Sequence, residues 1–175
     1  EGFGMTETSP VVSVNPFSGI QIGTIGIPMP STQCKVIDDE GNELPIGATG
    51  ELCVKGPQVM KGYWQRPEAT AETIVDGWLH TGDAGIFDDD GYLYIQDRVK
   101  DMIISGGVNI YPAEIEAALL VMPGVQDCAV FGIPHDEFGE SIAAAIETQP
   151  GASLSPEAVK DFLKAHISAY KVPRE

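Results

Sequence analysis

The chain has 175 residues, of which 43% are hydrophobic and 21% are charged, and its formal net charge is -16 at pH 7. This balance describes a globular protein with one ordinary domain or two small ones. The charge argues against binding to nucleic acid or to anionic membrane surfaces, because both are themselves negative. Cys34, Cys53 and Cys128 are odd in number and lack metal-ligand or redox spacing, which fits a reducing, cytoplasmic location. No apolar run approaches the length of a membrane span.

The first half of the chain is predicted to be rich in β-structure. Residues 33–56 predict a strand, an Asp-Glu-Gly-Asn turn and a second strand. Residues 66–77 are an exception, because a proline suits the first position of a short helix that Asp76-Gly77 is expected to close. Residues 78–98 then predict a β-hairpin with its turn at Asp90-Gly91.

After residue 98 the pattern changes to alternating strands and helices. Residues 102–112 predict a strand, a double-glycine turn and a proline that opens a helix over 112–125. Strands follow at 125–134 and 140–148, and a final helix has Ser155 as its N-cap. The residues expected on the buried faces of the two helices are Ile115, Ala118, Leu119, Met122, Val159, Phe162, Leu163 and Ile167.

The predicted boundary between these two parts is the polar stretch Asp97–Asp101. We therefore expect a mixed α/β and α+β chain in two domains. Residues 1–97 form a β-rich part, and residues 98–175 form a small α+β part.

Three short motifs could contact a ligand, and each also has an ordinary structural interpretation. Asp83 could accept hydrogen bonds from both hydroxyls of a ribose, or it could be a turn residue bonded to its own backbone, which is favoured for the motif alone. Arg98 suits a ribose or phosphate, and equally an ion pair with Asp97 or Asp101. The Gly106-Gly107 pair could admit a ligand to the backbone, although a hairpin turn is the simpler interpretation.

The order of the motifs is more specific than any one of them. The chain contains Gly-Phe-Gly-Met-Thr-Glu at 2–7, Gly-Tyr-Trp with Arg-Pro-Glu at 62–68, and Asp-Gly-Trp-Leu-His-Thr-Gly-Asp at 76–83. Asp-Arg-Val-Lys-Asp at 97–101 and Gly-Gly-Val-Asn with Pro-Ala-Glu-Ile-Glu at 106–116 follow. This series resembles the adenylate-forming superfamily of acyl-CoA synthetases, luciferases and peptide-synthetase adenylation domains. Within the superfamily, the residues of these motifs are most similar to those of bacterial long-chain fatty-acid CoA ligases.

The resemblance implies that the first motif binds ATP and AMP. The implied nucleotide contacts are Gly2, Phe3, Gly4, Met5 and Thr6, with Phe3 packed against adenine and Thr6 bonded to the α-phosphate. Glu7 would hold Mg²⁺, and Thr6 and Glu7 would be catalytic. These roles suit the residues, since a flat ring stacks on a base and a carboxylate suits a hard cation.

The resemblance also assigns roles in the later motifs. Asp83 would bind the ribose, with Arg98 beside it. Gly106 and Gly107 would line the path of the CoA pantetheine arm. Lys100 would be the pivot on which the small domain rotates between the two half-reactions.

The activity implied is that of an ATP-dependent fatty-acid CoA ligase. A carboxylic acid and ATP would give acyl-AMP and pyrophosphate, and the acyl group would then pass to CoA. Two alternatives remain open at this stage. One is an adenylation domain that loads a carrier protein, and the other is a non-catalytic, acidic interaction module.

Two parts of the family pattern are missing from the 175 residues. The glycine-rich phosphate loop with its lysine is absent, and so is the catalytic lysine near the family's C-terminus; Lys171 lacks the glycine context and is interpreted as a solvated surface lysine. We therefore expect the chain to be a C-terminal piece of a larger enzyme and to be inactive alone. We also expect self-association through apolar edges before Asp97.

Overall fold

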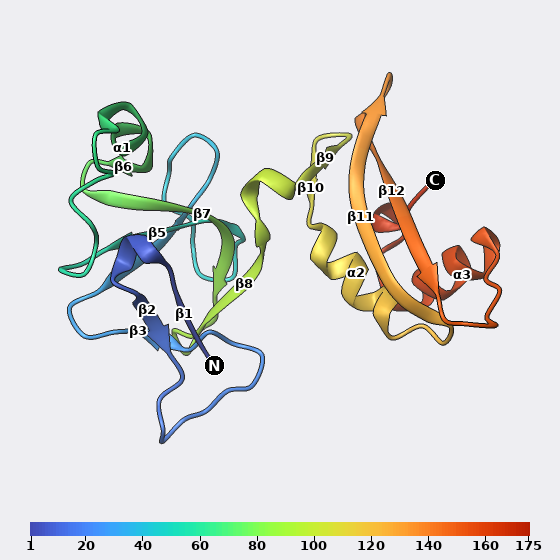
Figure 1. Ribbon diagram of the computed structural model, residues 1–175, viewed down its shortest axis with the longest axis horizontal. Helices are drawn as coiled ribbons and strands as arrows, with labels where there is room; N and C mark the ends of the chain where they lie inside the picture. The colour runs from blue at the N-terminus through green and yellow to red at the C-terminus, as the bar shows by residue number, and fades with distance from the viewer. The chain divides into compact units, whose positions relative to one another are not determined.

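The computed structural model describes residues 1–175, which fold as two compact units, Glu1–Val99 and Lys100–Glu175 (Figure 1). The break falls inside the polar stretch predicted to separate the two parts. No helix in either unit combines the length and apolar character needed to span a bilayer.

The first unit contains two antiparallel sheets. The smaller sheet has the order β1-β2-β3, and the larger one has the order β4-β5-β7-β6, with β8 also paired to β7. The strand bounds are β1 Gly2–Gly4, β2 Val11–Val14, β3 Ile27–Pro28, β4 Gln33–Ile37, β5 Gly50–Lys55, β6 Ile74–Val75, β7 Trp78–Phe87 and β8 Leu93–Arg98. The first unit also contains the 3-10 helix η1 (Thr6–Thr8) and the short helix α1 (Pro67–Thr73).

The core of the first unit joins residues that are distant in sequence. Val12, Leu52, Val54 and Leu93 are fully buried together, and Phe3 packs against them from β1. The predicted hairpin at 78–98 is confirmed as β7 and β8, and Gly91 adopts φ = 83° in its turn. The N-terminal strand β1 is thereby anchored to the same core as the larger sheet.

The predicted end of the first helix is wrong. Helix α1 ends at Thr73, and the next two residues form β6, which pairs with the start of β7. Asp76 and Gly77 have φ values of 52° and 79°, so they turn a β-hairpin instead of closing a helix. Two β-branched residues, Ile74 and Val75, favour the strand over a further helical turn.

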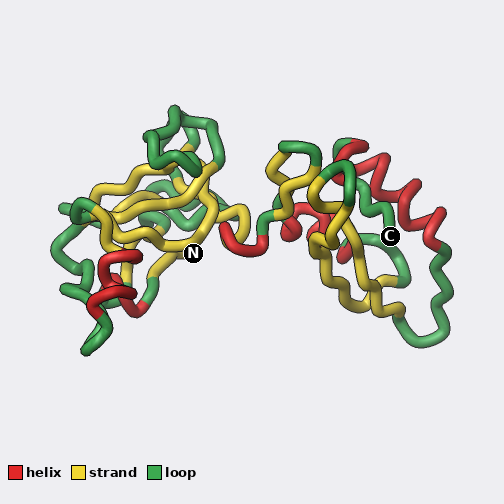
Figure 2. The backbone as a smooth tube through the Cα atoms, turned by 90° about the horizontal axis from the view of Figure 1, so that it is seen from above, coloured by secondary structure: helices red, strands yellow, loops and turns green.

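The second unit has one antiparallel sheet and two α-helices. Figure 2 colours helices red and strands yellow. The strand order is β10-β9-β12-β11. Strands β11 and β12 form a long hairpin that is paired from Val125 opposite Thr148 to His135 opposite Gly139, with a register shift between Val125 and Asp127. The element bounds are η2 Val99–Asp101 at the junction, β9 Ile103–Ser105, β10 Val108–Ile110, α2 Pro112–Leu120, β11 Val125–His135, β12 Gly139–Thr148, α3 Pro156–His166 and η3 Ala169–Lys171.

The predicted helical faces of the second unit are confirmed. Ile115, Leu119, Met122, Val159 and Leu163 are buried in one apolar core with residues of β9, β10, β11 and β12. Ala118, Phe162 and Ile167 pack against its margin. Ser155 caps α3, because its Oγ accepts a hydrogen bond from the amide of Ala158 at 3.2 Å.

Three details of the second unit differ from the expectation. Residues 108–110 form a strand that was not predicted, and it pairs with residues 103–105 in the hairpin that was the simpler interpretation of Gly106-Gly107. Helix α2 ends at Leu120, and Met122 enters the core from the turn that follows. Lys171 is not a solvated lysine, because its ammonium group pairs with the Glu114 carboxylate and its side chain is only 17% exposed.

Candidate functional site

The Gly-Phe-Gly-Met-Thr-Glu motif forms strand β1 and the 3-10 helix η1, with a tight return to β2. Gly4 is required by this return, because a Cβ there would lie 2.1 Å from the Pro10 carbonyl oxygen. Met5 donates its amide to the same carbonyl at 2.8 Å. The fully buried Thr8 hydroxyl donates to Pro10 O and lies within hydrogen-bond distance of Met5 N and O. The motif is therefore held in one shape, with Thr6 exposed at its surface.

Glu7 is connected to the Gly-Tyr-Trp motif. The Tyr63 hydroxyl donates to Glu7 Oε1 at 2.8 Å, and the Met60 amide donates to the Glu7 carbonyl at 2.8 Å. The hydrogen bond to Glu7 raises the pKa of the Tyr63 hydroxyl. Two motifs more than fifty residues apart in sequence are thus joined at the carboxylate predicted to hold Mg²⁺.

The Thr-Gly-Asp motif is a bulge inside strand β7. Glu51 pairs with Ala84 and Cys53 pairs with His80, so three residues of β7 face the single residue Leu52 of β5. Gly82 supplies φ = 71°, which favours glycine. The Thr81 hydroxyl donates to Leu52 O at 2.7 Å and accepts from the Asp83 amide at 3.1 Å. The bulge fixes the backbone on both sides of Gly82.

Asp83 and Arg98 are paired with each other. Arg98 Nη1 donates to Asp83 Oδ1 at 2.7 Å, with the two residues opposite each other on β7 and β8. The Asp83 side chain is 6% exposed and the Arg98 side chain 53% exposed. Burial raises the pKa of the Asp83 carboxyl, and the guanidinium of Arg98 partly offsets this. Asp83 therefore lies in strand β7 with its carboxylate engaged by a side chain of the neighbouring strand.

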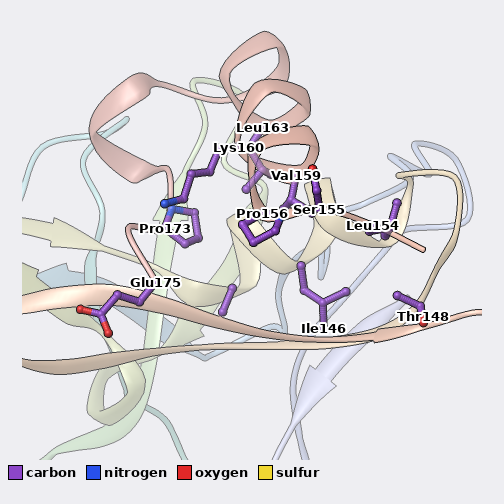
Figure 3. Close-up of a pocket in the computed structure, with 11 residues that line it drawn as sticks. Ile146, Thr148, Leu154, Ser155, Pro156, Val159, Lys160, Leu163, Pro173 and Glu175 are labelled. Carbon is purple, nitrogen blue, oxygen red and sulfur yellow. The ribbon is translucent and has the colours of Figure 1, made fainter. Parts of the chain in front are cut away.

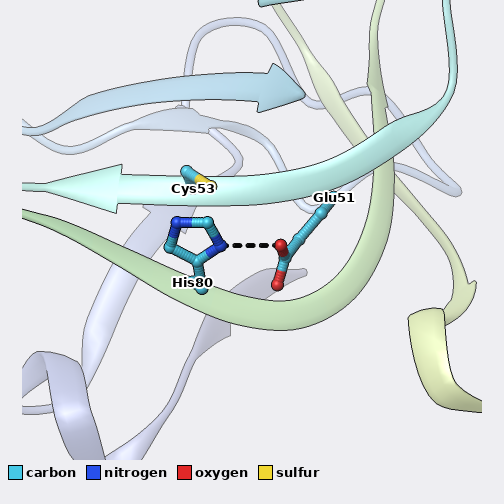
Figure 4. Close-up of side chains that lie close together, drawn as sticks. All are labelled: Glu51, Cys53 and His80. Carbon is cyan, nitrogen blue, oxygen red and sulfur yellow. Dashed lines mark hydrogen bonds and ion pairs between the residues drawn. The ribbon is translucent and has the colours of Figure 1, made fainter. Parts of the chain in front are cut away.

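Two residues that the sequence interpretation missed support the bulge. Glu51 Oε1 accepts the Gly82 amide at 3.0 Å, and its Oε2 lies 2.8 Å from His80 Nδ1 (Figure 4). Cys53 lies beside the same imidazole. No spacing rule pointed to this group, because Glu51 and His80 come from different strands and meet only through the pairing of β5 with β7.

The remaining predicted residues lie in the second unit. Gly106 and Gly107 have φ values of 60° and 78° and form the two-residue turn between β9 and β10. A Cβ on Gly107 would meet nothing within 4 Å, so its backbone angle alone favours glycine. Lys100 is exposed in η2, at the first residue of this unit.

A pocket of about 220 Å³ in the second unit contains none of the predicted site residues (Figure 3). It lies between β12 and α3, and its walls include the apolar residues Ile146, Leu154, Val159 and Leu163. The predicted nucleotide-binding groups are instead on the strands and turns of the first unit.

Comparison with known proteins identifies the family of the chain. Residues 1–64 match the AMP-binding enzyme family, and residues 114–175 match the AMP-binding enzyme C-terminal domain. A long-chain-fatty-acid–CoA ligase of Escherichia coli O6:H1 is 50% identical over 99% of this chain and 31% of its own length. The chain therefore belongs to the AMP-binding enzymes, the adenylate-forming family, and its predicted mixed fold is confirmed.

Two solved structures are similar over nearly the whole chain. ATP-bound MatB from Rhodopseudomonas palustris has a TM-score of 0.89 and 41% identity, covering 98% of this chain and 34% of that one. The o-succinylbenzoate CoA synthetase MenE of Bacillus subtilis, in complex with its acyl-adenylate intermediate, has a TM-score of 0.89 and 38% identity, covering 99% and 36%. The chain thus spans about a third of the length of the relatives it matches.

Proposed function

We propose that the chain is part of an ATP-dependent fatty-acid CoA ligase. The enzyme joins a fatty acid to AMP with release of pyrophosphate, and then transfers the acyl group to the thiol of CoA. The observation that carries the proposal is the Asp83–Arg98 pair on its bulge, in a chain half identical to a long-chain-fatty-acid–CoA ligase. The interpretation as a non-catalytic interaction module offers no reason for a buried carboxylate held in this way.

Asp83 has the hydrogen-bonding capacity that ribose recognition needs. An ionised carboxylate offers about four lone-pair sites, and Arg98 occupies one of them through Oδ1. The remaining sites can accept both ribose hydroxyls. Burial raises the pKa of the Asp83 carboxyl, and Arg98 opposes that rise. The half-exposed side chain of Arg98 is itself available to the sugar or a phosphate.

The first motif supplies groups for the phosphates. The exposed Thr6 hydroxyl can donate to the α-phosphate. Phe3, the residue predicted to pack against adenine, lies in β1, three residues before Thr6. Glu7 fits a Mg²⁺ ion, because Tyr63 engages only its Oε1 and Mg²⁺ binds through one or two carboxylates plus substrate phosphates. A bound Mg²⁺ would neutralise charge on the phosphates as pyrophosphate leaves.

Replacing Asp83 in the full-length protein tests the nucleotide site. Asp83→Ala removes the acceptor of two ribose hydroxyls, so ATP binding should weaken by about 1.5–3 kcal/mol, the cost of losing a hydrogen bond to a charged group. Calorimetry of ATP binding gives this loss, and the exposed turn variant Asp90→Ala is the matched control. Unchanged ATP affinity together with a collapse of thermal stability would assign Asp83 a purely structural role.

We further propose that Lys100 is the pivot between the two half-reactions and that Gly106 and Gly107 line the path of CoA. Lys100→Pro fixes φ and biases Val99 away from helical angles. Acyl-adenylate formation should largely persist while thioester formation falls by a much larger factor. Single-turnover assays of each step decide this, with Lys100→Ala as control. Equal losses in both steps, or none, would remove Lys100 from the mechanism.

The 175-residue chain alone is expected not to form acyl-adenylates. It spans about a third of the relatives' length and contains no glycine-rich phosphate loop with a lysine. ATP–pyrophosphate exchange with a panel of fatty acids measures this, and exchange above background by the pure chain would contradict it. Self-association through residues before Asp97 remains a separate prediction, which light scattering can test.

A further inference from the structure

We propose that Glu51, Cys53 and His80 form a binding site for one divalent transition-metal ion, and that Zn²⁺ is the ion it fits best. The site lies in the first unit, between strands β5 and β7. It is separate from the carboxylate of Glu7, and it involves none of the residues assigned to ATP, Mg²⁺ or CoA.

The pairing of the two strands brings the three ligand groups together. Cys53 and His80 are opposite each other in the ladder, and Glu51 is two residues before Cys53 on β5. One ligand atom from each residue lies within 4.8 Å of the other two, and Glu51 Oε2 is 2.8 Å from His80 Nδ1. Ligand atoms around tetrahedral zinc lie about 3.3–3.8 Å apart, given bonds of about 2.0–2.3 Å. Figure 4 shows the three side chains close together, and a bound ion would replace the hydrogen bond between His80 Nδ1 and Glu51 Oε2.

The chemistry of the three ligands selects the metal. A thiolate, an imidazole and a carboxylate together suit Zn²⁺, whereas Mg²⁺ and Ca²⁺ prefer oxygen ligands alone. The side chains of His80 and Glu51 are 27% and 23% exposed. This partial exposure gives the ion an entry path and leaves the fourth coordination position to a water molecule, the arrangement of zinc sites with three protein ligands.

Cys53 is the residue that distinguishes a metal site from a structural hydrogen bond. Glu51 and His80 alone are enough to support the bulge. Cys53 lies opposite His80 in the ladder and adds a thiol to the same group, with its ligand atom within 4.8 Å of the other two. Zinc binding replaces the S–H bond by an S–Zn bond, and the proton leaves to solvent.

The test uses the 175-residue chain and Co²⁺ as a spectroscopic probe for Zn²⁺. Titration should produce a thiolate-to-cobalt charge-transfer band in the near ultraviolet together with the visible bands of tetrahedral cobalt, saturating at one ion per chain. Added Zn²⁺ should remove both. Cys53→Ser should abolish the charge-transfer band, whereas Cys34→Ser and Cys128→Ser, which change the other two cysteines, should retain it.

Two further variants keep the proposal testable if Cys53→Ser fails to fold. Glu51→Gln retains an oxygen that can accept the Gly82 amide, and His80→Asn removes the imidazole. Each should weaken Co²⁺ binding by more than the roughly 10–100-fold that loss of an outer hydrogen-bond partner costs at a metal site, with circular dichroism unchanged. The proposal is overturned if the folded wild-type chain gives no charge-transfer band, or if the band survives in Cys53→Ser. Because no nucleotide is involved, the result is independent of the proposed ligase activity.

Discussion

The two units of this chain differ in what holds their irregular backbone in place. Five of the six buried polar residues, Thr8, Ser13, Thr24, Thr81 and Asp83, lie in the first unit, and only Ser141 lies in the second. Those in the first unit bond to backbone groups of turns and bulges or, for Asp83, to Arg98. Ser141 Oγ has no hydrogen-bond partner. The unit with the predicted nucleotide contacts is therefore shaped by side-chain hydrogen bonds, and the other by apolar packing.

The largest expected effect tests the apolar half of this comparison. Leu119→Ala opens a cavity in the core of the second unit, where the side chain is fully buried. The free energy of unfolding of this unit should fall by about 2–5 kcal/mol. Hydrogen exchange resolved by residue assigns the loss to this unit, and Leu120→Ala, whose side chain is 52% exposed, is the matched control. Similar losses for both variants would contradict a core that is specific to this helical face.

The next effect tests the polar half. Thr8→Val keeps the shape of a fully buried side chain but removes the hydroxyl that bonds to Met5 and Pro10. Leaving these buried groups unpaired should destabilise the first unit by about 1–3 kcal/mol. Thermal unfolding measures the loss, and Thr6→Val, at an exposed position, should stay close to wild type. Equal stability of both variants would show that the loop does not depend on its buried hydroxyl.

The smallest effect concerns the turn between β9 and β10 in the second unit. At Gly107 in this turn, only the backbone angle favours glycine. Gly107→Ala should cost about 1 kcal/mol, because φ = 78° is unfavourable for alanine while nothing lies near its Cβ. Gly107→Asn should cost less, since asparagine tolerates this region. Chemical denaturation separates the two variants. A clash at this turn, contrary to the structure, would make asparagine the more damaging of the two.

The comparison also explains how much the sequence could predict. In the second unit both helical faces, the Ser155 cap and the double-glycine turn follow from local rules of spacing and turn chemistry, and the structure confirms them. Helix ends were less predictable. Ile74 and Val75 were predicted to be helical, but they form strand β6 and pair with β7. Local rules use only neighbouring residues, so they cannot predict that a segment pairs with a strand that is distant in sequence.

The candidate site was predicted only in part for the same reason. Asp83 and Arg98 could each be selected from their motifs, but their ion pair depends on the β7–β8 register. No sequence motif predicted the contact between Glu51 and His80, since it depends on which residues of β5 face the bulge. Nothing in the sequence distinguishes Thr8 from the other threonines. Its hydroxyl stabilises the loop only because the tight return to β2 brings the Pro10 carbonyl within hydrogen-bond distance.

The bulge in β7 has a consequence for insertions and deletions. Between the pairs Cys53–His80 and Glu51–Ala84, strand β7 has two residues more than β5, and this excess is even. Side chains alternate between the two faces of a strand with a period of two. The alternation therefore continues unbroken on either side of the bulge. A deletion of two residues would straighten the strand and keep Ala84 on its face, whereas a deletion of one would turn the whole segment from Ala84 to Phe87 inside out.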